Sequence, residues 1–358
     1  MSYDNAKNTL PEIVHGDLDQ IVKLNINWDR FKNKTVFISG GAGLLPSYLV
    51  QSLLHANRLH NLKLKVICIS RSSESLNKRL GYCLNDPYFK GIIHDVTRPI
   101  PVEIMPSDFV IHAASQASPK FYAIDPVGTL LTNTIGTQHL LEYAVRSKAE
   151  RFMFFSSGEV YGVPLNQMEP ITETSYGYLD PMNVRSCYAE SKRIGETMSI
   201  AWAKQYSLDT VVARPFHTYG PGMALDDGRV FADFVADVVA KRDIVIRGDG
   251  SEKRCFCYLA DATAGFLSVL LNGINSEAYN VANPSCEISM KNLAKLISNL
   301  FPNRNIKIRF EDSGAKKNYI RSPILKALPS IEKIKKLGWL PETSLKEGFT
   351  KTIKSFIS

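Results

Sequence analysis

Residues 35–54, T-V-F-I-S-G-G-A-G-L-L-P-S-Y-L-V-Q-S-L-L, set the architecture of this chain. The apolar run 35–39 predicts a buried strand, and the apolar run after the glycines predicts a helix. A strand that enters a helix through a glycine turn is the start of a dinucleotide-binding βαβ unit. Gly40 would permit the turn, Gly43 the close approach of a pyrophosphate, and the free amides of Leu44 and Leu45 would meet its charge.

The glycine turn departs from the usual fingerprint at its third glycine, which is replaced by Pro46. Proline is tolerated in a first helical turn, although it is bulkier than glycine against a strand. A second strand is predicted over 65–70 and ends at Ser70 and Arg71, where an NAD enzyme usually presents an acid to the adenosine ribose. Because Arg71 could hold a 2′-phosphate, NADP competes with NAD as the cofactor.

Further strands are predicted at 91–96, 108–115, 151–157 and 210–215, and a helix at 126–147. Strands that alternate with helical segments predict an α/β fold with a doubly wound parallel sheet of Rossmann type. The small residues Ala113, Ala114 and Ser115 at a strand's carboxyl end suit a ligand passing close to the backbone.

The rest of the chain divides around this sheet. Residues 1–32 are predicted to be an N-terminal extension with a helix from Asp17 to Phe31. Residues 33–215, with 254–272, are predicted to form the dinucleotide-binding domain. Residues 216–253 and 273–358 have a less regular pattern and are predicted to form a smaller C-terminal substrate-binding lobe.

Composition excludes several classes of protein. The chain has 358 residues, is 44% hydrophobic and contains no apolar run long enough to span a membrane, so we expect a cytoplasmic protein without a membrane partner. Its six cysteines in so long a chain predict no disulfide framework, and Cys255-x-Cys257 lacks a second ligand pair, so no metal is predicted.

The net charge of +8 is concentrated in one segment. Residues 301–358 contain 13 Lys and Arg against 5 Asp and Glu, which equals the excess of the whole chain. No nucleic-acid motif accompanies this basic segment. The sequence therefore predicts an anionic small molecule, and no nucleic acid, as the partner.

A tyrosine and a lysine four residues apart form the candidate catalytic pair. The segment R-S-C-Y-A-E-S-K at 185–192 is predicted to be helical, which places Tyr188 and Lys192 on one face, a single turn apart. Tyrosine normally has a pKa near 10, and a cation held nearby favours the phenolate. We therefore expect Lys192 to lower the pKa of Tyr188 so that the phenolate acts as a base.

These motifs together resemble the extended short-chain dehydrogenase/reductase family of sugar-nucleotide epimerases, dehydratases and decarboxylases. The likeness covers roughly residues 34–350. It rests on S-G-G-A-G-L-L at 39–45, H-A-A-S at 112–115, N-T-I-G-T at 133–137, S-S-G-E-V-Y-G at 156–162, Y-A-E-S-K at 188–192, R-P-F-H-T-Y-G-P at 214–221 and L-G-W-L-P at 337–341. Four further segments, at 113–122, 176–193, 226–230 and 252–261, resemble the substrate loops of UDP-glucuronate decarboxylases.

The resemblance implies site residues. The implied catalytic residues are Ser157, Glu159, Tyr188 and Lys192. Further implied cofactor-binding residues are Asp95, Val96, Asn133 and Pro215, besides Tyr188 and Lys192. The implied substrate-binding residues are Ser118, Arg185, His217, Arg229, Arg247 and Arg254. NAD would stay tightly bound and be recycled. A nucleotide-sugar substrate and a homodimer formed by the helices around 126–147 and 188–205 are also implied.

The choice among reactions depends on one residue. Dehydratases of this family place an acid immediately before the position of Glu159, and here that residue is Gly158. We therefore expect decarboxylation of UDP-glucuronate to UDP-xylose. A 4-epimerase, an NADPH-dependent keto-sugar reductase and a non-catalytic dinucleotide-binding scaffold are alternatives. His217, Arg247 and Gly158 depart from the family's usual residues, which leaves the base and the sugar open.

Overall fold

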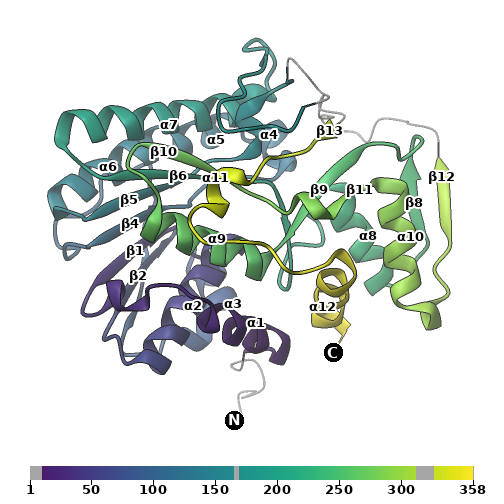
Figure 1. Cartoon of the computed structure of the whole chain (residues 1–358), viewed down its shortest axis with the longest axis horizontal. Helices are drawn as coiled ribbons and strands as arrows, with labels where there is room; N and C mark the ends of the chain where they lie inside the picture. The colour runs from purple at the N-terminus through teal and green to yellow at the C-terminus, as the bar shows by residue number, and fades with distance from the viewer. Residues whose placement is uncertain (1–9, 165–168, 312–325, 358) are drawn as a thin grey trace.

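The computed structural model describes residues 10–164, 169–311 and 326–357. Its main element is a seven-stranded sheet of order β10-β6-β5-β4-β1-β2-β3, in which every neighbouring pair is parallel (Figure 1). The strands are β1 (Thr35–Ser39), β2 (Lys65–Ser70), β3 (Phe89–Ile93), β4 (Phe109–His112), β5 (Arg151–Phe155), β6 (Thr210–Pro215) and β10 (Glu277–Val281). The order reverses between β1 and β4, as in a doubly wound dinucleotide-binding sheet.

Helices cover both faces of this sheet because side chains alternate between two hydrophobic clusters. In β1, Val36 and Ile38 belong to one cluster and Phe37 to the other. The first face carries α1 (Glu12–Lys23), α2 (Leu44–His60), α9 (Leu259–Asn272) and α11 (Glu332–Lys335). The second carries α5 (Pro126–Asn133), α6 (Ile135–Ser147) and α7 (Ser186–Tyr206). The sheet is thus buried on both sides.

The remaining elements form a second group beside the carboxyl ends of the strands of the large sheet (Figure 1). Here β9 (Lys253–Tyr258) pairs with β7 (His217–Tyr219), β11 (Glu287–Ser289) and β13 (Lys326–Ala327), and β8 (Ile244–Arg247) pairs with β12 (Ile308–Glu311). The helices of this group are α8 (Val230–Val239), α10 (Met290–Leu300) and α12 (Leu345–Ile357). Two short helices, α3 (Ser73–Leu80) and α4 (Pro119–Ile124), follow β2 and β4.

Two strands differ in their pairing from the predicted division of the chain. Strand β10 lies in the range 273–358, assigned to the lobe, and is an edge strand of the large sheet beside β6. Strand β9 begins at Lys253 and continues into the range 254–272, assigned to the dinucleotide domain, and it pairs with β7 in the smaller sheet. Short strands separated by turns do not reveal their partners in the sequence, because any of them could extend either sheet.

Several predicted elements also shift. Strand β3 ends before Asp95, whose side chain accepts hydrogen bonds from the amide and hydroxyl of Thr97 and so closes a turn. The helix predicted over 126–147 is interrupted at Thr134. The N-terminal helix, predicted from Asp17 to Phe31, is instead α1 (Glu12–Lys23) followed by a 3-10 turn at Trp28–Phe31.

A buried carboxylate joins α1 to three other elements. Asp17 on α1 is 0% exposed and accepts hydrogen bonds from Tyr258 of β9 at 2.6 Å, from Tyr48 of α2 at 3.2 Å and from Lys351 of α12 at 3.2 Å. Burial raises the pKa of Asp17 above its usual value, and the bonds from Tyr258 and Lys351 oppose that effect. We name this group the Asp17 clasp.

Replacing Asp17 with Ala is expected to lower the free energy of unfolding by about 3 kcal/mol, because Lys351 and two buried hydroxyls lose their acceptor. Equilibrium urea unfolding measures this loss. Glu12→Ala is the matched control, since Glu12 is an exposed acid on the same helix and its replacement should cost less than about 0.5 kcal/mol. If the two variants lost the same free energy of unfolding, the Asp17 clasp would not stabilise the fold.

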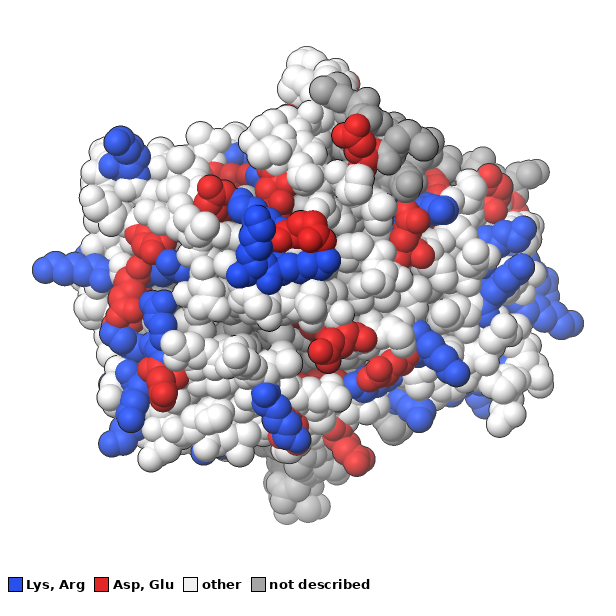
Figure 2. Space-filling view, in the orientation of Figure 1, with Lys and Arg blue, Asp and Glu red and all other residues white. Residues whose placement is uncertain are grey.

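The surface carries charges of both signs. On the face shown in Figure 2, basic and acidic side chains lie in scattered groups among uncharged residues. Part of the basic segment seen in the sequence, residues 312–325, lies outside the described residues. Within the described ranges, no helix is long and apolar enough to cross a membrane.

Candidate functional site

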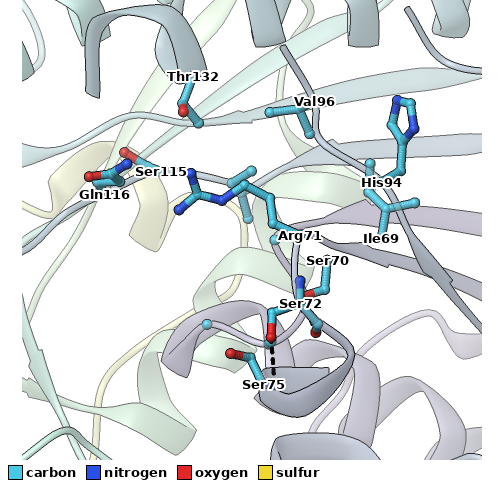
Figure 3. A pocket seen from close by; sticks show the side chains of 15 residues that line it. Ile69, Ser70, Arg71, Ser72, Ser75, His94, Val96, Ser115, Gln116 and Thr132 are labelled. Carbon is cyan, nitrogen blue, oxygen red and sulfur yellow. Dashed lines mark hydrogen bonds between the residues drawn. The ribbon is translucent and has the colours of Figure 1, made fainter. Parts of the chain in front are cut away.

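A cavity opens where the strand order reverses. Its lining residues come from the carboxyl ends of β1, β2, β3 and β4, from the start of α3 and from α5: Gly40, Ala42, Gly43, Ile69, Ser70, Arg71, Ser72, Ser75, His94, Val96, Ala113, Ala114, Ser115, Gln116 and Thr132 (Figure 3). This is the place at which open parallel sheets bind their ligands. The structure therefore brings together seven of the residues predicted to bind cofactor: Gly40, Gly43, Arg71, Val96, Ala113, Ala114 and Ser115.

Gly40 is required by the geometry of the turn. Its φ of +71° is a left-handed conformation, and a Cβ there would lie 2.5 Å from Cα of Ala114. Gly43 is the N-terminal cap of α2, so the amides of Leu44 and Leu45 in the first turn have no carbonyl partner within the helix. Leu44 and Leu45 do not line the cavity with their side chains.

Arg71 extends into the cavity toward Ser115 and Gln116 (Figure 3). Two carboxylates face it. Burial alone would raise the pKa of Asp95, but hydrogen bonds from Thr97 and the charge of Arg71 lower it overall. The pKa of Asp125 is lowered by a hydrogen bond from Gln116 and, to a smaller extent, by Arg71. The positive charge of Arg71 is thus partly compensated within the protein, which weakens the argument for a 2′-phosphate.

Buried polar atoms beside the cavity test whether a dinucleotide fits. Within the described ranges, Oγ of Ser115, Oε1 of Gln116 and Oδ1 of Asn133 are buried and have no hydrogen-bond partner. Buried polar atoms normally have partners. The hydroxyls and amide of a dinucleotide would supply them, and the turn at Gly40 leaves room for a pyrophosphate, so the residues present fit this cofactor.

Tyr188 lies in the first turn of α7 beside Ser157, which follows β5. The two side chains are hydrogen-bonded, and Oγ of Ser157 also accepts the amide of Glu159 at 3.2 Å. Lys192, one turn further along α7, is buried and donates to the carbonyl of Phe155 at 2.6 Å. Its ammonium lies 5.9 Å from the centre of the Tyr188 ring. The structure thus places the predicted Ser157, Tyr188 and Lys192 in one site.

The shift expected for the pKa of Tyr188 is wrong in direction. Burial raises the pKa of Tyr188 to about 12, and the hydrogen bond with Ser157 only partly offsets this. Burial also lowers the pKa of Lys192 to about 7. Both shifts have one cause, because a low-dielectric site disfavours the phenolate and the ammonium alike. The spacing in the sequence predicted that Tyr188 and Lys192 lie on one face of a helix, but it could not show that both side chains are buried.

A carboxylate and a guanidinium lie next to this pair. Nη2 of Arg185 donates to Oε2 of Glu159 at 3.2 Å. Arg185 also lies over the ring of Tyr122, which stacks on Tyr188 with ring centres 4.9 Å apart. The predicted Glu159 and Arg185 therefore meet beside the candidate base. Gly158 has no space for a side chain, since a Cβ would lie 2.9 Å from the ring of Phe216.

The other predicted substrate residues approach from the second group of elements. The pKa of His217 is lowered to about 3 by burial and by the charges of Arg254 and Arg229. Arg229 pairs with Asp227, whose carbonyl accepts a hydrogen bond from Ser118 at 2.6 Å. Ser118, His217, Arg229 and Arg254 therefore form one cluster of neutral donors and cations.

Four predicted residues have other positions. Arg247 ends β8, is exposed and pairs in register with Glu311. Asp95 and Pro215 do not line the cavity. Asn133 is buried beside it and donates to Ser191 of α7 at 3.0 Å. Their roles in binding remain predictions.

The sequence analysis overlooked several residues of the site. Ser72 and Ser75 line the cavity at the start of α3, where Oγ of Ser72 accepts the amide of Ser75 at 3.2 Å. A serine three residues ahead of another, just after a strand, is a helix-capping signal that would have found them. Tyr122 was quoted within a motif, but nothing in the sequence shows that it stacks on Tyr188.

Comparison with known proteins agrees with this geometry. The model of the NAD dependent epimerase/dehydratase family matches residues 36–282. The chain belongs to this family. It is therefore an enzyme, and its cofactor is NAD.

Named relatives of this family member cover most of its length. UDP-glucuronic acid decarboxylase 3 of Arabidopsis thaliana is 37% identical over 316 residues, which cover 88% of this chain and 87% of that protein. UDP-glucuronic acid decarboxylase 1 of Danio rerio is 34% identical over 323 residues, covering 90% and 72%. Among solved structures, a UDP-glucuronic acid 4-epimerase of Bacillus cereus has a TM-score of 0.74 at 21% identity, covering 90% of this chain and 98% of that one. This last likeness shows the fold.

Proposed function

We propose that this family member decarboxylates UDP-glucuronate to UDP-xylose. The observation that carries the proposal is the meeting of Tyr188 and Ser157 with the Glu159–Arg185 pair, beside a Gly158 that leaves no space for an acid. Such a site can act on a sugar hydroxyl and bind a carboxylate, but at position 158, where dehydratases of this family carry the acid that protonates the departing hydroxyl, it has a glycine. The relatives named as decarboxylases support the choice.

The chain's residues would act first on the 4-hydroxyl of the sugar. Tyr188 takes the hydroxyl proton as the phenolate, and Ser157 donates a hydrogen bond to the same oxygen. Lys192 would hold the cofactor ribose and adds positive charge beside the phenolate. NAD, when bound, would supply the hydride acceptor for this oxidation and the hydride donor for the final reduction. Glu159 and Arg185 orient the sugar ring and its carboxylate.

The 4-keto sugar is a β-keto acid, and this determines the second step. The bond between carbon 5 and the carboxyl carbon breaks, carbon dioxide leaves, and the electron pair forms an enolate. Tyr188, now protonated, and Ser157 both donate to the enolate oxygen. A proton from solvent then adds to carbon 5, which gives the 4-keto pentose. The phenol of Tyr188 returns its proton to the sugar oxygen as the keto group is reduced.

The decisive experiment is mass spectrometry of the products after incubation of the purified protein with UDP-glucuronate and no added cofactor. Loss of carbon dioxide to give a UDP-pentose is the expected result. A new isomer of unchanged mass would overturn decarboxylation in favour of 4-epimerisation. An unchanged substrate would indicate another nucleotide-sugar, since the cytosine and thymine nucleotides remain open.

Glu159→Gln is expected to reduce turnover of UDP-glucuronate by about 10²-fold, because the neutral amide no longer compensates Arg185 and the sugar ring and its carboxylate lose their orientation. Steady-state kinetics with the purified variant measure this. Glu190→Gln is the control, since Glu190 lies on α7 and pairs only weakly with Arg193 at 3.4 Å. A Glu159 variant as active as the control would contradict the assigned role.

The assembly and cellular setting are further parts of this proposal. Exposed apolar side chains on α4, α5 and α7 support a homodimer through these helices: Phe121, Ile124, Val127, Leu131, Ile194 and Ile200. All six cysteines are free, which supports a reducing, cytoplasmic compartment. A UDP-xylose product would serve polysaccharide biosynthesis. The group of elements around β9, with residues 216–253 and 282–357, would form the substrate-binding lobe. Sedimentation velocity tests the dimer.

A further inference from the structure

A buried ion pair lies directly behind the catalytic pair. Glu196 stands one turn beyond Lys192 on α7, and its carboxylate accepts Nε of Arg214 at 2.8 Å and Nη2 at 2.6 Å. Arg214 belongs to β6. The side chain of Glu196 is 15% exposed and that of Arg214 is 6% exposed. A bidentate pair of this kind fixes both side chains.

The same carboxylate is tied to the strand that carries Ser157. Oγ of Ser156 donates to Oε1 of Glu196 at 2.5 Å, and the ammonium of Lys192 donates to the carbonyl of Phe155 at 2.6 Å. Two successive residues at the end of β5 are therefore held by two successive turns of α7. The next residue along the chain is Ser157, the hydrogen-bond partner of Tyr188.

Arg214 is itself fixed from a second side. Its Nη1 donates to the hydroxyl of Tyr161 at 2.8 Å and to the carbonyl of Glu173 at 2.9 Å. Tyr161 in turn donates to Oδ1 of Asn280 on β10 at 2.5 Å. The cation that holds Glu196 is thus anchored to the 3-10 turn Gly158–Tyr161 and, through Tyr161, to β10.

The charged and titratable groups that face Lys192 come from three elements. From β4, His112 stays neutral because burial and the charge of Lys192 lower its pKa to about 3. From α7 itself come Tyr188 and Glu196, and from β5 the ring of Phe154 lies 4.8 Å from the ammonium. Burial lowers the pKa of Lys192, and the charge of Glu196 opposes that effect.

We propose that Glu196 is a positioning residue for this enzyme. It supplies the counter-charge of the Lys192 ammonium and, through Ser156, fixes the end of β5 that leads into Ser157. Arg214 holds Glu196 in place. The proposal rests on the proposed function only for the choice of substrate. Its electrostatic part concerns Lys192 alone and is tested without any substrate.

The first test is a direct titration of Lys192. The full chain is labelled with ¹³C at the ε-carbon of lysine, and the Lys192 signal is assigned by its loss in Lys192→Arg. In Glu196→Gln, a negative charge is lost while Arg214 remains, so the midpoint of Lys192 is expected to fall by about one pH unit. In Arg214→Met, the carboxylate acts on Lys192 without its compensating cation, so the midpoint is expected to rise.

Shifts of the Lys192 midpoint in opposite directions in the two variants would distinguish the proposal from a purely structural role of Glu196. Both variants break the same buried ion pair, so a structural role predicts similar losses of stability and no opposed shifts. Asp209→Asn is the matched control, because Asp209 pairs with Arg151 at 2.7 Å at the opposite end of β5. Shifts of Lys192 in the same direction in both variants, or no shift, would overturn the electrostatic part.

The geometric part is tested by a milder change. Ser156→Ala removes the hydrogen bond to Glu196 and leaves every charge in place, and its small volume change favours correct folding. We expect kcat for UDP-glucuronate to fall about tenfold with the Lys192 midpoint unchanged. Unchanged kcat would overturn this part. If wild-type protein leaves UDP-glucuronate intact, the proposed substrate fails, while the titration still decides the role of Glu196.

Discussion

Replacing Tyr188 with Phe is expected to lower turnover of UDP-glucuronate by about 10³-fold, the largest effect of any change at the reacting atoms. The ring and its stacking on Tyr122 remain, but the hydroxyl that we propose exchanges a proton with the sugar is lost. Steady-state kinetics measure the loss, and the dinucleotide released on denaturation is quantified by chromatography. We expect the variant to retain its cofactor.

Tyr122→Phe is the matched control for this change. The two rings are stacked and both are buried, but the hydroxyl of Tyr122 donates to the carbonyl of Ala117 at 2.9 Å instead of facing Ser157. Its loss should cost a few-fold in activity. Should both variants lose activity equally, the effect would belong to the packing of the rings, and Tyr188 would not be the base.

Replacing Gly40 with Ala is expected to remove NAD binding and to lower the free energy of unfolding by about 3 kcal/mol. Two costs add together here. The left-handed backbone at φ +71° is unfavourable for alanine, and its Cβ would lie 2.5 Å from Cα of Ala114. Because the obstruction is backbone, β1 and β4 must separate at the point where the cofactor would sit. Urea unfolding and the dinucleotide content of the purified variant measure the two effects.

Gly338→Ala is the control that separates the cost of the left-handed backbone from the cost of the collision with Ala114. Gly338 has φ +84° and nothing within 4 Å of the position of a Cβ, so its replacement adds backbone strain without a collision. We expect a loss of about 1 kcal/mol and an unchanged cofactor content. If the two glycine variants behaved alike, the close approach at Ala114 would have no special importance.

Much of the central sheet could be predicted from the sequence, because its strands are continuous apolar runs between polar turns. The ranges of β1, β2 and β6 match those expected. Strand β4 ends at His112, three residues before the predicted end. The cause is a side chain: Oγ of Ser39 accepts the amides of Ala113 and Ala114, so these residues leave the ladder. A hydrogen bond between distant strands has no local signature.

The sequence motifs pointed to most residues of the candidate site, but not to the direction in which their pKa values shift. Motifs identified Tyr188, Lys192, Ser157 and Glu159, and the structure brings them together. Motifs could not show that burial dominates the pKa of Tyr188 and of Lys192, because burial depends on how α7 packs on β5. The same limit applies to Glu196, whose partner Arg214 arrives from another strand.

The Asp17 clasp has a consequence for how the protein is made. Its partners on α2, β9 and α12 are spread over the chain, and Lys351 is 334 residues from Asp17. During synthesis from the N-terminus, the carboxylate of Asp17 therefore lacks its cation until residue 351 has left the ribosome. We expect nascent chains stalled before α12 to leave α1 open to proteolysis, so that the first helix made is among the last to be secured.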